Sequence, residues 1–75
     1  MRVIIKTVKG ETYPIQCENG WTIAQIKAEV FKLLSVEAES QKLIYKGKHL
    51  EDAKTLSELG VNNDDSLVLM IMKVN

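Results

Sequence analysis

Only one stretch of this sequence combines an apolar pattern of helical period with the length of a helix. From about Ile23 to Leu34, apolar residues recur mostly at spacings of three and four. Thr22 and Gln25 form the Thr-x-x-Gln pattern of a capping box, which predicts that this helix begins at Ile23. A single helix excludes a doubly wound α/β sheet, and a ferredoxin-like fold would need a second helix. The side chains expected on the buried face are Ile23, Ile26, Ala28, Val30, Leu33 and Leu34, and those expected at the surface are Gln25, Lys27, Glu29 and Lys32.

Two strand patterns precede the helix. Residues 1–7 and 12–17 alternate between apolar and polar side chains, which indicates two half-buried strands. Gly10 lies between them and favours a hairpin with a bulged turn, because glycine adopts a positive φ without strain. Pro14 has no N–H to donate, so the second strand is expected at an edge of the sheet.

Strand patterns also follow the helix. Residues 42–45 and 48–50 fit a tight hairpin around Lys46-Gly47, and residues 66–74 are expected to form the last strand. Between them we expect one short helical turn near residues 56–61. The predicted fold class is therefore α+β, with one mixed sheet, one α-helix across it and the order ββαββ.

The composition excludes several kinds of protein. One Cys and one His provide neither an intramolecular disulfide nor the four ligands of a structural zinc site. Ten Lys and Arg balance ten Asp and Glu, and general nucleic-acid binding needs a basic surplus. The longest apolar run, Leu67–Met72, is far shorter than the roughly 20 residues that span a bilayer. We expect no metal and no cofactor, and neither nucleic acid nor a membrane as partner.

The last strand lacks the polar outward positions expected of a sheet that a helix covers on one face. Its inward residues would be Leu67, Leu69 and Ile71, which leaves Val68, Met70 and Met72 to point to solvent. Strand 42–45 repeats the pattern, since an inward Leu43 places Ile44 outward. The sequence offers no second helix to cover this outer side.

The outward apolar residues define a candidate binding patch. Exposed apolar patches with charged rims usually mark interaction sites. The predicted apolar cluster is Val8, Ile44, Val68 and Met70, and the basic residues expected around it are Lys6, Lys42, Lys46, Lys48 and His49.

Catalytic residues are not expected. Cys17 and His49 are the sole thiol and imidazole, but Cys17 has an inward strand position and His49 lies by the predicted hairpin. The adjacent acids Glu51-Asp52 and Asp64-Asp65 fall in loops, without the pocket that acid–base catalysis requires. We therefore predict that the protein is not an enzyme.

The sequence resembles ubiquitin and the ubiquitin-like domains without a gap from Met1 to Lys73. Besides Thr55-Leu56-Ser57 and Leu67-x-Leu69, three longer segments carry the resemblance. They are the opening Met-x-x-x-x-Lys-Thr-x-x-Gly-x-Thr over residues 1–12, the helix start Thr-Ile-x-x-x-Lys-Ala over residues 22–28, and Gln-x-Leu-Ile-x-x-Gly-Lys-x-Leu-Glu-Asp over residues 41–52. The resemblance implies a β-grasp fold in which the first and last strands pair in parallel at the sheet centre. It also implies a buried ion pair between Lys27 and Asp52.

Two further features refine the resemblance. The sequence ends Lys73-Val74-Asn75, where conjugated relatives of ubiquitin carry a Gly-Gly tail, so we do not expect it to be conjugated in this form. Residues 41–48 and 68–73 are more similar to the N-terminal ubiquitin-like domain of proteasome shuttle proteins that also serve in DNA excision repair. In that family the domain docks on proteasome receptor subunits and contacts ubiquitin-associated domains. The positions that match the family's binding residues are Val8, Ile44, Gly47, Lys48, Val68 and Met70.

The resemblance thus implies a non-catalytic, monomeric interaction module of the cytoplasm and nucleus, which binds proteasome receptor subunits or ubiquitin-interacting helices and delivers ubiquitinated cargo. Residues 1–75 are expected to be a single domain at the N-terminus of a longer protein. The alternatives are a ubiquitin-like modifier whose Gly-Gly tail is missing from this sequence, and the ubiquitin-like domain of a chaperone adaptor. Whether Trp21 and Phe31 form a second contact surface stays open at this stage.

Overall fold

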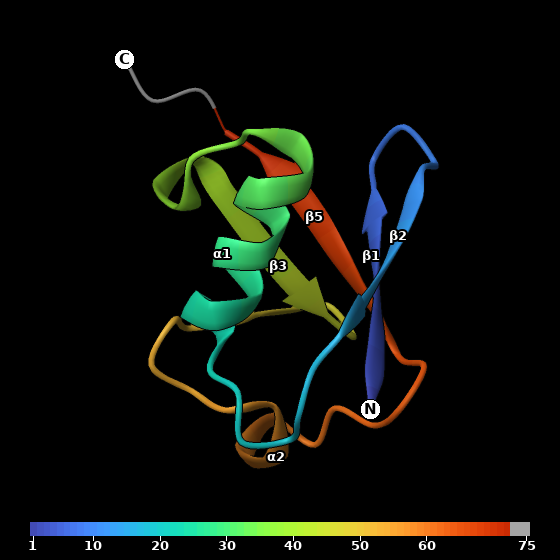
Figure 1. The fold of residues 1–75 in the computed structure, drawn as a ribbon, viewed down its shortest axis with the longest axis vertical. Helices are drawn as coiled ribbons and strands as arrows, with labels where there is room; N and C mark the ends of the chain where they lie inside the picture. Colours follow the sequence, from blue (N-terminus) through green and yellow to red (C-terminus); the bar gives the residue numbers. More distant parts are fainter. Residues whose placement is uncertain (73–75) are drawn as a thin grey trace.

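A computed structural model describes residues 1–72, in which a five-stranded mixed sheet packs against one long helix (Figure 1). The strands are β1 (Arg2–Thr7), β2 (Thr12–Gln16), β3 (Gln41–Tyr45), β4 (Lys48–His49) and β5 (Ser66–Ile71). The helices are α1 (Ile23–Leu34), the short 3-10 helix η1 (Ala38–Ser40) and the single turn α2 (Leu56–Leu59). The expected α+β class and the order ββαββ are confirmed. None of the helices in residues 1–72 has both the length and the apolar character needed to cross a membrane.

The sheet has the strand order β2-β1-β5-β3-β4. β1 and β5 pair in parallel, and the other neighbouring strands pair antiparallel, as the β-grasp resemblance implied. The strand that contains Pro14 is at an edge, as predicted. The N–H of Cys17 donates to the carbonyl of Met1, so the odd-numbered residues of β2 direct their main-chain groups to β1. The missing N–H of Pro14 is therefore on the open edge, where it breaks no ladder hydrogen bond.

Local signals fix both ends of α1. Thr22 accepts a hydrogen bond from the main-chain N–H of Gln25, and the Gln25 side chain accepts one from the N–H of Thr22, which completes the predicted capping box. Ser35 ends the helix in the left-handed conformation, and its N–H donates to the carbonyl of Phe31.

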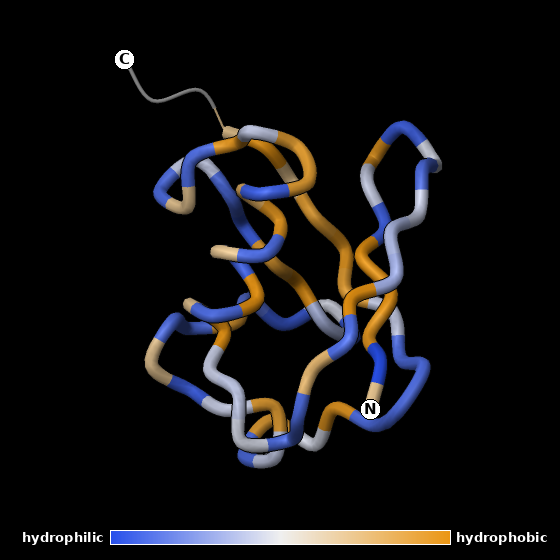
Figure 2. Tube along the Cα trace, in the orientation of Figure 1, coloured by the Kyte–Doolittle hydropathy of each residue, from blue (hydrophilic) through white to orange (hydrophobic). Residues whose placement is uncertain are grey.

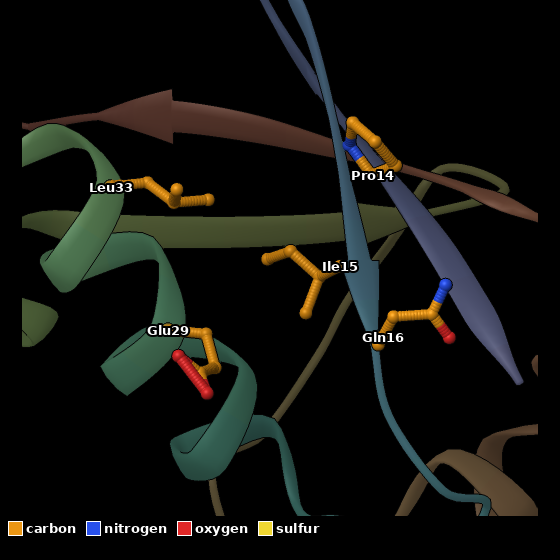
Figure 3. A pocket seen from close by; sticks show the side chains of 5 residues that line it. All are labelled: Pro14, Ile15, Gln16, Glu29 and Leu33. Carbon is orange, nitrogen blue, oxygen red and sulfur yellow. The ribbon is translucent and has the colours of Figure 1, made fainter.

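The buried face of α1 differs from the prediction at three positions. Ile23, Ile26 and Val30 are buried as expected, but Ala28 and Leu33 are exposed and Lys27 is buried. At about 100° per residue, Lys27 lies beside Ile23 at one margin of the stripe formed by the three buried apolar residues, whereas Ala28 faces away from it. Leu33 lies at the margin of the stripe, on the side toward β2, and is 55% exposed (Figure 3). Leu34 is half-buried.

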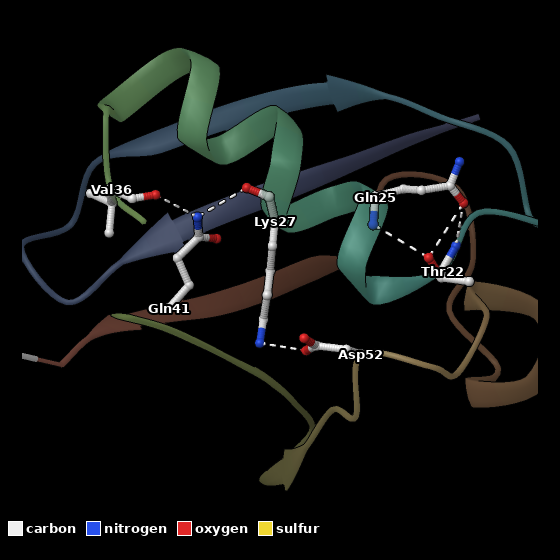
Figure 4. A network of polar contacts seen from close by, with 6 residues as sticks. All are labelled: Thr22, Gln25, Lys27, Val36, Gln41 and Asp52. Carbon is white, nitrogen blue, oxygen red and sulfur yellow. Dashed lines mark hydrogen bonds and ion pairs between the residues drawn. The ribbon is translucent and has the colours of Figure 1, made fainter. Parts of the chain in front are cut away.

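An ion pair makes the burial of Lys27 possible. The Lys27 ammonium lies 2.6 Å from Oδ1 of Asp52, in the loop before α2 (Figure 4). The pair implied by the resemblance is thus present, but only its lysine end is buried, since the Asp52 side chain is 60% exposed. Beside it, the buried amide of Gln41 donates to the carbonyls of Lys27 and Val36, both at 2.9 Å, and ties β3 to the middle of α1 and to the segment that follows this helix.

The core lies between α1 and the sheet, and the hydropathy colouring shows apolar segments facing each other there (Figure 2). In β5, Leu67 and Leu69 point into the core, as predicted. Ile71 does not, because it ends the strand opposite Gln41 at the margin of the sheet and is 55% exposed. The predicted continuation of this strand through residues 73 and 74 lies outside the described residues. Trp21 is half-buried and packs against the core, whereas Phe31 is exposed on α1.

Candidate protein-interaction face

The strand register brings four predicted site residues into one row across the sheet. Lys6 of β1 lies opposite Val68 of β5, Val68 lies opposite Ile44 of β3, and Ile44 lies opposite His49 of β4. Their neighbours along β5, Leu67 and Leu69, point into the core, so this row points away from α1. We call the side of the sheet that points away from α1 the outer face.

A second pair of residues extends the row toward the end of β5. Met70 lies opposite Lys42, and each is two residues from a member of the row. Side chains two residues apart in a strand share a face, so Met70 adjoins Val68 and Lys42 adjoins Ile44. Val68 and Met70 are exposed, and Ile44 is half-buried between its neighbours. The structure therefore brings together three of the four residues of the predicted apolar cluster, Ile44, Val68 and Met70, which we call the apolar centre.

The turns carry the next predicted residues. Val8 follows β1, two residues after Lys6, and is 72% exposed. Lys46 and Gly47 connect β3 to β4, and their φ angles of 52° and 78° are those of a two-residue hairpin with mirror-image turn geometry. A Cβ atom at Gly47 would meet nothing within 4 Å, so glycine suits this position through its backbone conformation rather than through lack of space.

Two of the predicted basic residues lie away from the row. Lys48 lies opposite Tyr45, which points into the core, so Lys48 leaves β4 on the side opposite to Ile44. The ammonium of Lys46 lies 5.3 Å from the centre of the Tyr45 ring, within range of a cation–π contact. The basic side chains next to the apolar centre are therefore Lys6, Lys42 and His49, whereas Lys46 and Lys48 are at the hairpin end.

Ile4 also belongs to the outer face, although it was not among the predicted site residues. It is half-buried and lies opposite Ser66 on one side and Pro14 on the other. The sequence could have predicted this, because side chains alternate between the two faces of a strand and Ile4 is two residues before Lys6.

A hydrogen-bonded carboxylate supports the face from the turn before β5. The hydroxyl of Tyr45 and the main-chain N–H of Asn62 both donate to Asp65. The hydrogen bond from Tyr45 is the main cause that lowers the pKa of Asp65, and the same bond raises the pKa of Tyr45. The contact fixes the turn that leads into β5, and so helps to set where Val68 lies.

The residues considered for catalysis are not brought together. Cys17 follows β2 and His49 lies in β4, at the two opposite edges of the sheet. Burial raises the pKa of the Cys17 thiol, which disfavours the reactive thiolate. Within residues 1–72, no three His, Cys, Asp or Glu side chains converge in a way that could hold a metal ion.

Comparison with known proteins gives a family match over nearly the whole chain. The sequence profile described as "Ubiquitin family" matches residues 3–73, which include the whole outer-face row. The chain is 39% identical over 66 residues to the UV excision repair protein RAD23 of Saccharomyces cerevisiae, a match that covers 88% of the chain and 17% of that protein. It is 34% identical over 74 residues to the probable ubiquitin receptor RAD23 of Oryza sativa subsp. japonica, covering 95% of the chain and 19% of that protein.

A third relative has a different description. The chain is 32% identical over 71 residues to ubiquitin-like protein 4A of Xenopus laevis, a match that covers 95% of the chain and 48% of that protein. The chain therefore spans less than half the length of each of these three relatives.

Proposed function

The chain belongs to the ubiquitin family, and we propose that it is a non-catalytic interaction module, which docks on proteasome receptor subunits or ubiquitin-binding helices and helps to deliver ubiquitinated cargo. Relatives described as a UV excision repair protein and as a probable ubiquitin receptor support this proposal. The observation that carries it is the apolar centre of the outer face, formed by Ile44, Val68 and Met70.

The geometry of the outer face suits a short amphipathic helix as partner. Such a helix presents an apolar stripe to a surface, and here Ile44, Val68 and Met70 would receive that stripe. A fully buried apolar side chain contributes about 1.5–3 kcal/mol, and ordering and association costs offset much of the sum. Three or four such contacts correspond to a dissociation constant on the order of micromolar. Weak binding of this kind fits a carrier that releases its cargo.

The charge next to the apolar centre defines the partner further. Lys6, Lys42 and His49 border the apolar centre, and among the outward strand positions of β3, β4 and β5 there is no acidic residue. We infer that acidic residues flank the apolar stripe of the partner. Opposite charges at the rim of an interface speed association and are screened by salt. The association rate is therefore expected to fall as ionic strength rises, and an association rate independent of salt would contradict this assignment.

An NMR titration tests the proposed docking. A ¹⁵N-labelled sample of the chain is titrated with a proteasome receptor subunit and, separately, with a ubiquitin-interacting helix. The expected result is saturable shifts at the amides of Lys6, Ile44, His49, Val68 and Met70. Shifts confined to α1, or no shifts at concentrations of about 1 mM, would refute docking through the outer face.

The ubiquitin-like domain of a chaperone adaptor remains an alternative, and so does a conjugated modifier. The reading frame around this sequence distinguishes it from a shuttle or an adaptor. A Gly-Gly pair soon after Asn75 would identify a modifier, whereas a polar linker followed by small helical domains would identify a shuttle or adaptor.

A further inference from the structure

A hollow of about 230 Å³ lies between α1 and the edge strand β2, away from the outer-face row. Its lining residues are Pro14, Ile15, Gln16, Glu29 and Leu33 (Figure 3). The hollow is open to solvent because Leu33, predicted to belong to the core, is 55% exposed.

The two apolar walls of the hollow face each other. Leu33 points from α1 toward β2, and Ile15 points from β2 toward α1 (Figure 3). Ile15 is buried and forms the base, whereas Leu33 forms an exposed side. Glu29 is four residues before Leu33, and residues at that spacing share one side of a helix. A carboxylate therefore stands next to the apolar walls.

The open edge of β2 adds hydrogen-bond acceptors. Even-numbered residues of this strand direct their main-chain groups away from β1, because Cys17 N–H donates to Met1 and Thr7 N–H donates to the carbonyl of Glu11. Pro14 lies opposite Ile4 of the outer face, so its ring points away from the hollow. At Pro14 the edge offers a carbonyl and no N–H, and at Gln16 it offers one of each. Acceptors thus outnumber donors around the hollow.

We infer that this hollow is a second contact site, which takes an arginine side chain from a protein partner. The aliphatic stem of arginine would pack between Ile15 and Leu33, and its guanidinium would donate to the Glu29 carboxylate and to the edge carbonyls. Arginine fits better than lysine because its five N–H donors are fixed in a plane and serve several acceptors at once.

The present partner of Glu29 does not prevent this contact. Lys32 lies 3.6 Å from the Glu29 carboxylate, longer than a charge-assisted hydrogen bond, and its side chain is largely exposed. Exposed ion pairs of this kind contribute little to stability, so a guanidinium held by additional contacts displaces Lys32 from Glu29. The site also does not depend on the proposed function, since the hollow and the outer-face row lie on different sides of the sheet. Both sites can be occupied at once.

An NMR titration with single amino-acid probes tests the inference. The ¹⁵N-labelled chain is titrated with N-acetyl-arginine amide and with N-acetyl-citrulline amide, a neutral side chain of nearly the same shape. We expect saturable shifts at Ile15, Gln16, Glu29 and Leu33, with a dissociation constant on the order of millimolar for arginine. The citrulline probe should bind at least about threefold more weakly, because it lacks the charge that would form one exposed ion pair with Glu29.

Two matched variants separate a specific contact from general attraction of charge. Glu29→Gln is expected to weaken arginine binding about threefold or more. Glu37→Gln removes an exposed acid that follows α1 and is not in the lining, and it should leave binding unchanged. The inference is overturned if shifts appear elsewhere, if citrulline binds equally well, or if the two variants have the same effect.

Discussion

Ile44→Ala is expected to separate partner binding from folding. Ile44 lies between Val68 and His49 and is only half-buried in the free protein. A fully buried isoleucine costs roughly 2–5 kcal/mol when it is replaced by alanine. Because part of the Ile44 side chain already contacts water on the outer face, we expect a smaller loss, about 1 kcal/mol in the free energy of unfolding. For a domain of this size that loss lowers Tm by about 4–8 °C, so the variant remains folded at 25 °C.

The effect on binding is expected to be larger than the effect on stability. A partner that covers the outer-face row buries the part of Ile44 that is exposed in the free protein. Covering the exposed part of Ile44 contributes about 1 kcal/mol, since each buried methylene contributes about 0.8 kcal/mol, and the gap that the truncation leaves against a packed partner costs a similar amount. The expected loss in binding free energy is about 2 kcal/mol, which corresponds to a dissociation constant about 30-fold larger. A micromolar interaction would then fall below detection in a titration at low micromolar concentration.

Isothermal titration against a proteasome receptor subunit measures this loss, and thermal unfolding of the same samples measures stability. Phe31→Ala is the matched control, since Phe31 is 44% exposed but lies on α1, on the other side of the sheet. The control should bind like the unmodified chain. Unchanged affinity of Ile44→Ala, or an equal loss in Phe31→Ala, would refute the assignment of the outer face.

Three further outcomes follow from the polar and titratable contacts. Asp52→Ala leaves the buried Lys27 charge without its partner and should lower the free energy of unfolding, measured in urea, by about 1–3 kcal/mol. Lys27→Met should lower it less, because this substitution removes the buried charge itself. The reverse order would contradict the role of the ion pair. Tyr45→Phe removes the hydrogen bond that lowers the pKa of Asp65. Because the pKa of Asp65 is lower in the folded state, this contact stabilises the fold above about pH 4, and the stabilisation is lost as pH falls through the folded-state pKa. The Tm difference between the unmodified chain and the variant should therefore shrink in acid. A difference that stays constant with pH would exclude this contact. Cys17 should react with a thiol reagent only after unfolding in guanidinium, and labelling of the native protein at the unfolded rate would show that the thiol is accessible.

The elements of the fold could be predicted because each has a local signal. The capping box at Thr22 fixes the start of α1, and Pro14 marks β2 as an edge strand, whatever the rest of the chain does. The buried ion pair required the family resemblance. Lys27 reads as a surface residue by its type, and its neutralising partner Asp52 is 25 residues away in the sequence.

The sequence predicted which residues belong to the candidate site, but only part of how they are arranged in space. Alternation along one strand predicts which residues point outward, but the position of Val68 beside both Ile44 and Lys6 depends on the register of three strands. The turn at Lys46-Gly47 was predicted, but the sides to which Lys46 and Lys48 point were predicted wrongly, although a two-residue turn pairs Lys48 with Tyr45. The left-handed φ of Lys46 and the pairing of Lys48 with Tyr45 move these lysines away from the row.

The order of the strands in space decides what a partner can recognise. The row consists of residues 6, 68, 44 and 49, in that order across the sheet, so it combines both ends of the described chain with its middle. No short peptide from this sequence contains the row, and the complete row does not exist until β5 has paired with both β1 and β3. A partner that binds there therefore discriminates the folded chain from every unfolded or partly folded form of it. Binding at this face therefore depends on the folded conformation as well as on the sequence. A misfolded copy of the chain would not bind, even without a separate mechanism that inactivates it.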